Sequence, residues 1–376
     1  MFFLVLCLAM SGLAGCKSIQ NISEKLIGEG PTKENTLKDM NAVVDAVNEG
    51  LQDGKEEITL FVAVTEEEIS AIGTYMSPFW GKAARYSILS TYDEDEKSGA
   101  KMKVRIELEQ SVNYYAYQAY LDPEYPMPAE QTQATELLAA LKEAITEIYS
   151  GQDISSEFDQ VLAAHDWLVK NVSYGEDLPS DSPLNSAAGA LIDRVTMCQG
   201  YSEALQLILL CATDVQTDIV VGNAMDRENN QWVGHAWNII NIDGTWMHVD
   251  ATFDDPLGSP EGLASHYYFG QTDEVMRSNH EWAEGYWPSA TETDFAFYRR
   301  AGLYVDGRSA FELTVDSLTE QCVTHIELAV INTELTEDRF QFVYTDNPNV
   351  ETLTRSLTDV AGTTIVNITP TYTYYY

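Results

Sequence analysis

Basic residues are scarce in this chain of 376 residues. Lysine and arginine together number 21, against 59 aspartates and glutamates, so the formal net charge is −38. Proteins that bind nucleic acid neutralise its phosphates with clustered positive side chains, and the only adjacent basic pair here is Arg299-Arg300. The composition therefore argues against nucleic acid as a partner.

Motifs that hold metal ions or nucleotides are also missing. The sequence has no His-Glu-x-x-His, no Cys-x-x-Cys, no EF-hand loop and no Gly-x-x-x-x-Gly-Lys phosphate loop. Asp254-Asp255 could attract calcium, but two adjacent carboxylates before Pro256 more often shape a turn. We therefore expect neither a metal ion nor another cofactor.

Long apolar segments are absent after residue 16. Residues 1–16 are almost wholly apolar, but a bilayer-spanning helix needs about 20 residues, so this run is typical of a signal peptide. Leu13-Ala14-Gly15-Cys16 resembles the bacterial lipobox, in which the cysteine becomes the lipidated first residue of the mature protein. We expect an extracytoplasmic protein that is anchored to the bacterial cell membrane through lipid on Cys16. An uncleaved short anchor is the alternative.

Cysteines number only five, and they do not suggest a disulfide framework. Cys7 lies in the predicted signal peptide and Cys16 at its end, which leaves Cys198, Cys211 and Cys322. An odd number of thiols in an exported chain indicates at least one free and reactive cysteine.

The length favours more than one domain, because single hydrophobic cores seldom grow beyond roughly 250 residues. A polar stretch with glycines and a proline makes residues 17–35 a flexible tether. Three prolines precede a long amphipathic helix that is predicted over 129–149, so we place a domain boundary there. The expected modules cover residues 36–126, 127–298 and 299–376.

The two end modules are predicted to mix helices and strands. In the first, we expect a helix over 37–51, a capped helix that begins at Thr65, and strands over 58–64, 84–92 and 101–119. In the last, we expect helices over 317–330 and 349–358 and strands over 339–346 and 363–376. Both modules would end in a tyrosine-rich strand, which indicates two related α/β modules. Chance similarity is the alternative.

Four sequence blocks follow one another between residues 157 and 287. They read D-W-L with N-V-x-Y, then C-Q-G-Y-S, then H-A-W-N, and then W-x-H-V-D-A-T-F-D-D-P. This order resembles the bacterial transglutaminase-like family, which is related to papain-type cysteine proteases. The resemblance implies an α+β fold with a papain/transglutaminase-like core, in which a helix that carries a nucleophilic cysteine packs on an antiparallel sheet. The two small α/β modules would flank this core.

Cys198 is the predicted nucleophile. It precedes the apolar period of Ala204, Leu205, Ile208 and Leu209, so it would lie at the N-terminus of a helix, where unpaired amides and the helix dipole stabilise a thiolate. A thiol pKa of about 8.5 can fall to about 3.5 to 7.5 in such a position. Cys211 lies later on the same predicted helix and is interpreted as a small buried hydrophobic residue.

His235 and Asp250 are the predicted base and orienting acid. His235 opens the predicted strand HAWNIINI and Asp250 ends the next one, TWMHVD, with Asp243-Gly244 between them as a hairpin signal. Two adjacent strands would then hold the imidazole beside the carboxylate. Asp250 would accept a hydrogen bond from one ring nitrogen and leave the other to exchange a proton with the thiol.

His248 is the competing base, because residues two apart share a strand face and it would point to the same side as Asp250. It lies about 6.6 Å from Asp250 along the strand, whereas a cross-strand neighbour can approach within about 5 Å. His235 is therefore preferred. His165 lies on the apolar side of a predicted helix over 157–171 and is interpreted as structural. The remaining histidines are interpreted as structural or exposed: His266, His280 and His325.

An acyl-transfer site also needs donors for the oxyanion of the tetrahedral intermediate. The amide of Cys198 is one, and the second stays open between Tyr174, Gln199 and Trp237. Three tryptophans near the predicted hairpin are either core aromatics or walls for a substrate: Trp232, Trp237 and Trp246.

The expected function is that of an exported thiol-dependent acyl-transfer enzyme. A Cys198-His235-Asp250 triad would act on peptide or carboxamide bonds, as a cysteine peptidase, an amidase or a protein-glutamine transamidase, with a protein or peptide of the cell envelope as a suitable substrate. Hydrolysis is preferred, because transamidation needs a site that excludes water from the thioester. The alternative is a catalytically silent binding module at the cell surface.

Overall fold

The structure is a computed structural model, and it describes residues 30–77, 79–93, 97–151, 154–179, 181–226, 230–255, 264–292, 294–335, 349–360 and 362–372. The predicted signal peptide with Cys16 and the predicted strand over 339–346 lie outside the described residues. Among the residues that are described, no helix is both long and apolar enough to cross a membrane. The chain forms two compact units, Met1–Gln118 and Ala119–Tyr376, and the division into three modules stays a prediction.

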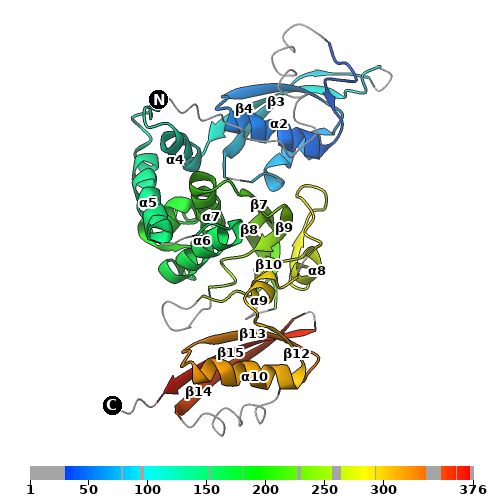
Figure 1. The fold of residues 1–376 in the computed structure, drawn as a ribbon. Helices are drawn as coiled ribbons and strands as arrows, with labels where there is room; N and C mark the ends of the chain where they lie inside the picture. Colours follow the sequence, from blue (N-terminus) through cyan, green and yellow to red (C-terminus); the bar gives the residue numbers. More distant parts are fainter. Residues whose placement is uncertain are drawn as a thin grey trace, which may run out of the picture. The chain divides into compact units, whose positions relative to one another are not determined.

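The first unit is a four-stranded sheet with one main helix (Figure 1). Its elements are β1 (Thr36–Leu37), α2 (Met40–Gln52), β2 (Glu57–Val62), α3 (Glu66–Ser70), β3 (Gly81–Thr91) and β4 (Met102–Gln110). The strand order is β1-β2-β4-β3, with β1 parallel to β2 and the other pairs antiparallel. α2 buries one apolar stripe against this sheet, and the predicted capping box of α3 is present between Thr65 and Glu68.

One prediction for this unit was wrong. The strand that was predicted over 101–119 ends at Gln110, and the tyrosine-rich segment after it is helix α4 (Val112–Leu121). Ser111 Oγ accepts a hydrogen bond from the Tyr114 amide at 3.1 Å, so Ser111 caps this helix. Buried positions then recur every three residues, at Asn113, Ala116 and Ala119, which is a helical spacing and not the alternation of a strand.

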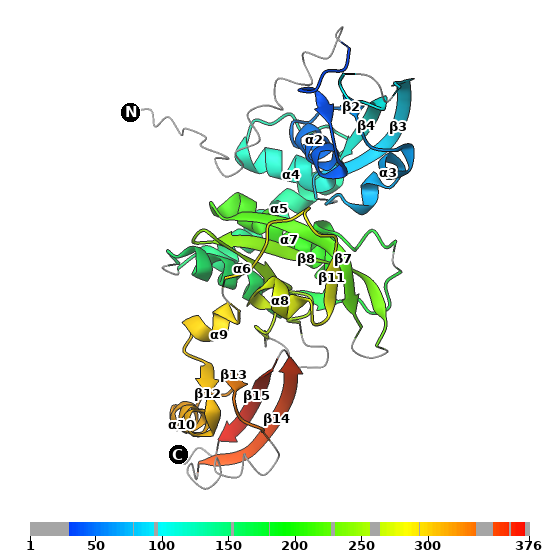
Figure 2. The ribbon, with the colours of Figure 1, turned by 90° about the vertical axis from the view of Figure 1, so that its right-hand side faces the viewer.

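A five-stranded antiparallel sheet is the centre of the second unit. Its strands are β7 (Gln216–Met225), β8 (Trp232–Ile242), β9 (Thr245–Val249), β10 (Phe269–Gln271) and β11 (His280–Trp282), in the order β10-β9-β8-β7-β11. Three helices accompany the sheet: α5 (Thr132–Tyr149), α6 (Glu157–Asn171) and α7 (Cys198–Ala212). α7 packs on β7 and β8 and contacts α5 and α6, so it is buried on almost every side (Figures 1 and 2).

Short elements accompany this central sheet. They are the parallel pair β5 (Ser173–Tyr174) and β6 (Val195–Thr196), a π-helical turn (Gly189–Asp193), α8 (Asp273–Met276) and α9 (Ala296–Arg300). The hairpin that was predicted between β8 and β9 is present, because Ile242 pairs with Thr245. Asp243 and Gly244 both have positive φ, 54° and 85°, as a two-residue type I′ turn requires.

The C-terminal part of the second unit is a smaller layer of one helix and one sheet. It contains β12 (Tyr304–Asp306), α10 (Gly307–Glu320), β13 (Ile326–Ile331), β14 (Val350–Val360) and β15 (Thr363–Tyr372). The strand order is β12-β13-β15-β14, with β12 parallel to β13 and the other pairs antiparallel. Phe311 and Val315 of α10 pack into the same apolar cluster as Leu328 and Val366 of the sheet.

Two predicted helices of this part were wrong. The helix over 317–330 is replaced by the end of α10 and by β13, whose residues are almost all buried between β12 and β15. The helix over 349–358 is instead β14, which pairs along its whole length with β15. Its threonines favour a strand, and pairing with a neighbour decides between the two structures where the apolar spacing is ambiguous.

Candidate active site

Helix α7 begins at Cys198. Its first turn packs closely against the preceding strand, because a Cβ at Gly200 would lie 1.8 Å from Thr196 Oγ1 and 2.7 Å from the Ser186 carbonyl oxygen. A glycine two residues after the thiol is therefore required for this packing. The Cys198 thiol hydrogen-bonds with the His235 side chain and accepts a hydrogen bond from the Ala236 amide.

Strand β8 holds His235 and the turn after β9 holds Asp250. His235 Nε2 lies 2.7 Å from Asp250 Oδ2, and both side chains are almost fully buried. Asp250 Oδ1 accepts hydrogen bonds from the amides of Thr252 and Phe253 at 3.1 and 3.2 Å. These bonds fix the carboxylate. Because the carboxylate occupies Nε2 of His235, the Nδ1 atom is left for the thiol.

His235 and Asp250 are diagonal neighbours across strands β8 and β9. Asn238 pairs with Val249, so one further step places Trp237 opposite Asp250, with His235 two residues beyond it. The preference for a cross-strand partner of Asp250 is consistent with this geometry. The pairing itself is the diagonal one and not the direct one.

The three charges of this group support one another. Burial would raise the pKa of the Cys198 thiol, but the hydrogen bond and charge of His235 lower it overall. Burial opposes protonation of His235, yet Asp250 and the thiol together raise its pKa to about 10. Burial likewise disfavours the Asp250 anion, but His235 and His280 hold its pKa well below the usual range. The three groups therefore each favour the charged form of the others: a thiolate, an imidazolium and a carboxylate.

His248 belongs to a different hydrogen-bond chain. The Trp237 indole donates to its Nδ1 at 2.9 Å, and its Nε2 lies 2.9 Å from Asp273 Oδ1. Burial lowers its pKa, so it is a neutral imidazole with the proton on Nε2. It makes no hydrogen bond to Asp250 among the described residues, and it is connected to neither the carboxylate nor the thiol.

His280 was missed as a site residue. It was interpreted as structural or exposed, but its Nε2 lies 3.1 Å from Asp250 Oδ2, so the carboxylate is shared by two imidazoles. Its Nδ1 faces Asn279 Oδ1 at 2.7 Å. Only the pairing of β11 with β7 brings it here, and nothing in the local sequence signals that pairing.

Two of the candidate oxyanion donors are engaged elsewhere. Gln199 Nε2 donates to Glu203 Oε1 at 2.8 Å, and the Trp237 indole donates to His248. Tyr174 of β5 pairs with Thr196 of β6, and Thr196 lies two residues before Cys198 in the chain. The Tyr174 side chain is half-buried. Within the described part of the chain, its hydroxyl has no hydrogen-bond partner. Tyr174 therefore has a free donor, and it interacts electrostatically with the Cys198 thiol.

The other residues that the sequence singled out are distributed as follows. Trp237 is buried and Trp246 is partly buried in the same core cluster, whereas Trp232 is 45% exposed on β8 three residues before His235. The acidic pair after Asp250 is bonded: Asp254 is fully buried and accepts from the Tyr268 amide, and Asp255 accepts from the Tyr201 hydroxyl at 2.5 Å. The interpretation of this pair as part of a turn agrees with the structure.

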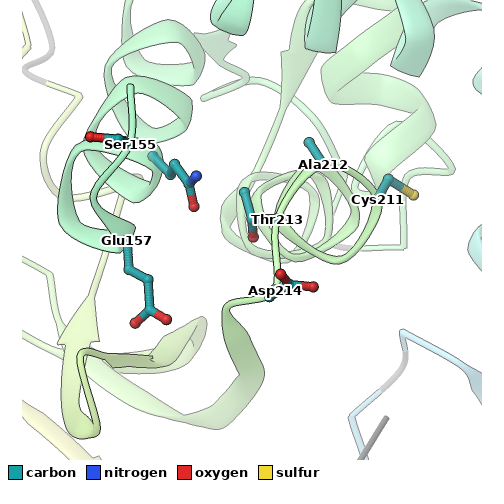
Figure 3. A pocket seen from close by; sticks show the side chains of 7 residues that line it. Ser155, Glu157, Cys211, Ala212, Thr213 and Asp214 are labelled. Atoms are coloured by element: carbon teal, nitrogen blue, oxygen red, sulfur yellow. The ribbon is translucent and has the colours of Figure 1, made fainter. Parts of the chain in front are cut away.

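Cys211 is far from this group on the same helix, about 20 Å away at 1.5 Å per residue. Burial raises its thiol pKa to about 12. It lies at the rim of a cavity of about 460 Å³ whose walls are mostly polar (Figure 3). The cavity also contacts Ser155, Glu157, Gln160, Thr213 and Asp214. None of the residues that line this cavity belongs to the Cys198 group.

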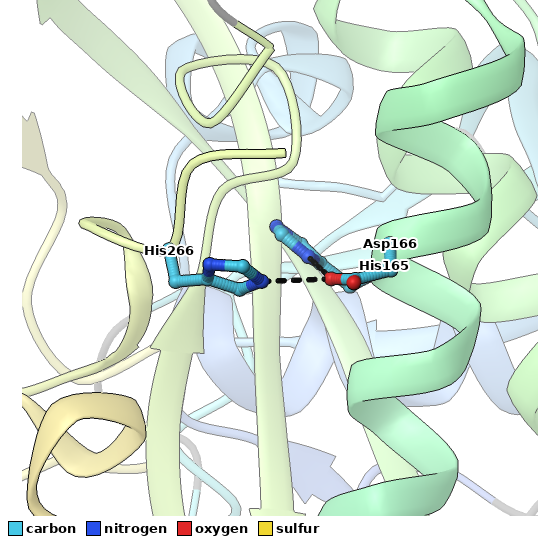
Figure 4. Close-up of side chains that lie close together, drawn as sticks. All are labelled: His165, Asp166 and His266. Carbon is cyan, nitrogen blue, oxygen red and sulfur yellow. Dashed lines mark hydrogen bonds and ion pairs between the residues drawn. The ribbon is translucent and has the colours of Figure 1, made fainter. Parts of the chain in front are cut away.

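Two sets of side chains in the described residues could hold a metal ion. One is His235, Asp250 and His280, and the other is His165 and Asp166 of α6 with His266 (Figure 4). The second set lies outside the Cys198 group and is considered separately below.

Comparison with known proteins gives one family match. Residues 144–251 match the family model described as the transglutaminase-like superfamily. No curated protein matches the sequence. Among solved structures, a TGase is similar at 15% identity over 56% of this chain and 54% of that chain, with a TM-score of 0.29.

Two further structures are a candidate cysteine protease from Cytophaga hutchinsonii and a candidate protease from Parabacteroides distasonis. The first has 18% identity, 48% and 64% coverage of this chain and that chain, and a TM-score of 0.26. The second has 11% identity, 77% and 57% coverage, and a TM-score of 0.25. This chain thus spans 54 to 64% of the length of these three structures. Residues 144–251 are thus similar to the transglutaminase-like superfamily, and Cys198, His235 and Asp250 all lie within this segment.

Proposed function

We propose that this protein is a thiol-dependent acyl-transfer enzyme that cleaves peptide or carboxamide bonds. The observation that carries the proposal is the hydrogen-bonded order Cys198, His235, Asp250, in which a thiol at a helix N-terminus meets an imidazole that a buried carboxylate orients. This is the arrangement of a nucleophile, its base and the group that orients the base.

In the first half of the reaction, the Cys198 thiolate attacks the carbonyl carbon and a C–S bond forms. The carbonyl oxygen becomes an oxyanion, for which the amide of Cys198 and the hydroxyl of Tyr174 are the proposed donors. The His235 imidazolium then gives its Nδ1 proton to the leaving nitrogen as the C–N bond breaks. An amine departs and an acyl thioester remains on Cys198.

In the second half, neutral His235 takes a proton from water or from an acceptor amine that attacks the thioester. The C–S bond breaks, the acid or the new amide leaves, and the thiolate–imidazolium pair returns. Asp250 stays ionised throughout and stabilises the imidazolium. Hydrolysis is the proposed outcome, because transamidation needs a site that excludes water from the thioester and nothing in the sequence indicates one.

A peptide library tests this proposal directly. The purified protein is incubated with the library, with and without an added primary amine, and the products are identified by mass spectrometry. Cleaved or deamidated peptides support hydrolysis, and peptides that carry the amine support transamidation. If neither product forms and peptides are only retained, the chain acts as a surface binding module instead. Cys198→Ala serves as the matched blank.

We also propose export and attachment to the bacterial cell membrane through lipid on Cys16. The support is the sequence alone: an apolar run that ends in Leu13-Ala14-Gly15-Cys16. Metabolic labelling with a fatty acid should mark the full chain and not Cys16→Ser. Equal labelling of the two would refute lipidation at this residue.

A further inference from the structure

A second group of ligand-type side chains shares no residue with the Cys198 group, and in it two residues of one helix face a histidine from another segment (Figure 4). His165 and Asp166 are neighbours on this helix, and His266 comes from the segment before β10. Asp166 Oδ1 lies 3.2 Å from His165 Nδ1 and 2.9 Å from His266 Nε2. The three ligand atoms all lie within 4.8 Å of one another, so one small ion could contact all of them.

The outward nitrogens of both imidazoles are also held by carboxylates. His165 Nε2 lies 3.2 Å from Asp254 Oδ2, and His266 Nδ1 lies 2.8 Å from Glu327 Oε2. Both carboxylates are buried. Each histidine therefore has one nitrogen toward Asp166 and the other on a separate carboxylate, and this is the outer-shell arrangement that fixes the ring and tautomer of metal-binding histidines.

The rings of this group are fixed by aromatic neighbours as well. His266 stacks on Phe297 with ring centres 3.8 Å apart and planes 10° apart, and His165 meets the edge of Phe269 at 5.0 Å. Lys170 binds the second oxygen of Asp166, Oδ2, at 2.6 Å. The ammonium therefore leaves Oδ1, the oxygen that faces the two imidazoles, for another cation.

We propose that His165 Nδ1, Asp166 Oδ1 and His266 Nε2 bind a divalent transition metal ion of the zinc class, with water as the fourth ligand. Zinc holds nitrogen and oxygen ligands at about 2.0 to 2.1 Å in a tetrahedron, which separates neighbouring ligand atoms by about 3.3 Å. The separations of 2.9 and 3.2 Å are close to this value. The Asp166 side chain is 25% exposed, so water can reach the ion, whereas His165 is fully buried.

The other candidate set fits a metal ion less well. His235, Asp250 and His280 also converge, but the outward nitrogens of their imidazoles face a thiol and the Asn279 side chain, and no second carboxylate among the described residues bonds to either ring. The carboxylate pattern around His165 and His266 is therefore the distinguishing observation. The proposed ion would join α6 directly to the segment before β10, and through the outer carboxylates to the turn at Asp254 and to strand β13, and it would have a structural role.

Zinc binding by the full chain tests the proposal. All measurements use a Cys198→Ala background, because a thiolate is itself a good zinc ligand. The protein is stripped with a chelator, reloaded with zinc, and passed through a desalting column before its metal content is measured. We expect one zinc per chain, and competition with a chromophoric chelator gives its affinity. His266→Gln should lose the bound zinc, and Glu327→Gln should weaken binding by about 10- to 100-fold.

His248→Gln is the matched control, because His248 is also a buried histidine bonded to a carboxylate, and it should bind zinc like the parent. A stripped parent that takes up no zinc, or a His266→Gln protein that binds it unchanged, would overturn the proposal. So would loss of zinc in His280→Gln and not in His266→Gln, because the ion would then lie in the other set. If His266→Gln does not fold, Asp166→Asn takes its place. The cobalt form of the parent should show the visible bands of a tetrahedral nitrogen and oxygen site, and an octahedral spectrum would contradict the predicted coordination.

Discussion

Removal of the His235 imidazole should change how the reactivity of Cys198 depends on pH. In the parent, the hydrogen bond and charge of His235 outweigh burial and lower the pKa of the thiol. His235→Gln keeps a polar side chain of similar length but cannot carry the charge. Burial, which raises a thiol pKa, is then opposed only by the Ala236 amide and the helix N-terminus. The thiol should therefore behave like an ordinary or a weaker acid.

The expected size of this effect follows from the fraction of thiolate. A thiol with an ordinary pKa of about 8.5 is about 80 times more ionised at pH 8 than at pH 6, so iodoacetamide should label Cys198 in His235→Gln about 80 times faster at the higher pH. In the parent the same ratio should be much closer to 1. Because the ratio compares one protein with itself, differences in intrinsic nucleophilicity between the two thiolates cancel.

The assay is limited alkylation followed by peptide-resolved mass spectrometry. Cys211 is an internal control, because burial raises its pKa to about 12 and it should stay unlabelled at both pH values. His248→Gln is the matched control, since His248 is bonded to Trp237 and Asp273 and should leave the parent ratio unchanged. A steep ratio in the parent, or a flat one in His235→Gln, would refute the assignment of His235 as the partner of the thiol.

Four further outcomes are expected on any substrate that the parent turns over. Cys198→Ala should abolish turnover with an unchanged melting curve, and loss of cooperative melting would indicate a structural cysteine instead. The kcat/KM of the parent should fall only well above pH 6.5, because Asp250 and the thiol outweigh burial and raise the pKa of His235, so its proton persists into the alkaline range; a fall near 6.5 would contradict the ion pair. Tyr174→Phe should lower kcat by about 10²- to 10³-fold with little change in KM, and an unchanged kcat would exclude it as an oxyanion donor. Asp250→Asn should lower kcat by about 10⁴-fold, and a loss below tenfold would show that the carboxylate is dispensable.

The parts of the site that were predictable from the sequence have local causes. The Asp243-Gly244 turn sets the register of β8 and β9, because both residues adopt positive φ, and that register brings His235 to Asp250. The helical period after Cys198 in the same way places the thiol at the start of α7. Each of these signals involves only neighbours in the chain, and the family resemblance supplied the order of the blocks.

The parts that were missed depend on contacts between distant segments. His280 reaches Asp250 only because β11 joins the edge of the sheet beside β7. Asp166 and His266 are 100 residues apart and meet through the packing of α6 against the segment before β10. No spacing rule connects such residues, and for this reason the absence of metal-binding motifs in the sequence did not indicate this cluster.

The two flanking sheets were expected to belong to related modules, and the observation behind that expectation was wrong. They were compared through tyrosine-rich strands, but the first of these is helix α4. Their topologies nevertheless agree. In each, two parallel strands are joined by a helix, and two further strands follow, the second of which pairs with the second parallel strand. The strand orders are therefore β1-β2-β4-β3 and β12-β13-β15-β14. A parallel crossover through a helix followed by an antiparallel hairpin satisfies the same packing rules in unrelated sequences, so the agreement does not require common descent. Evidence for a duplication would be a similarity that the shared strand order does not require. Equivalent residues at the contacts of α2 with β2 and of α10 with β13 would be such a similarity. These elements bury apolar residues, Val47 and Leu60 in one module and Val315 and Leu328 in the other, and any buried helix–sheet contact needs such residues.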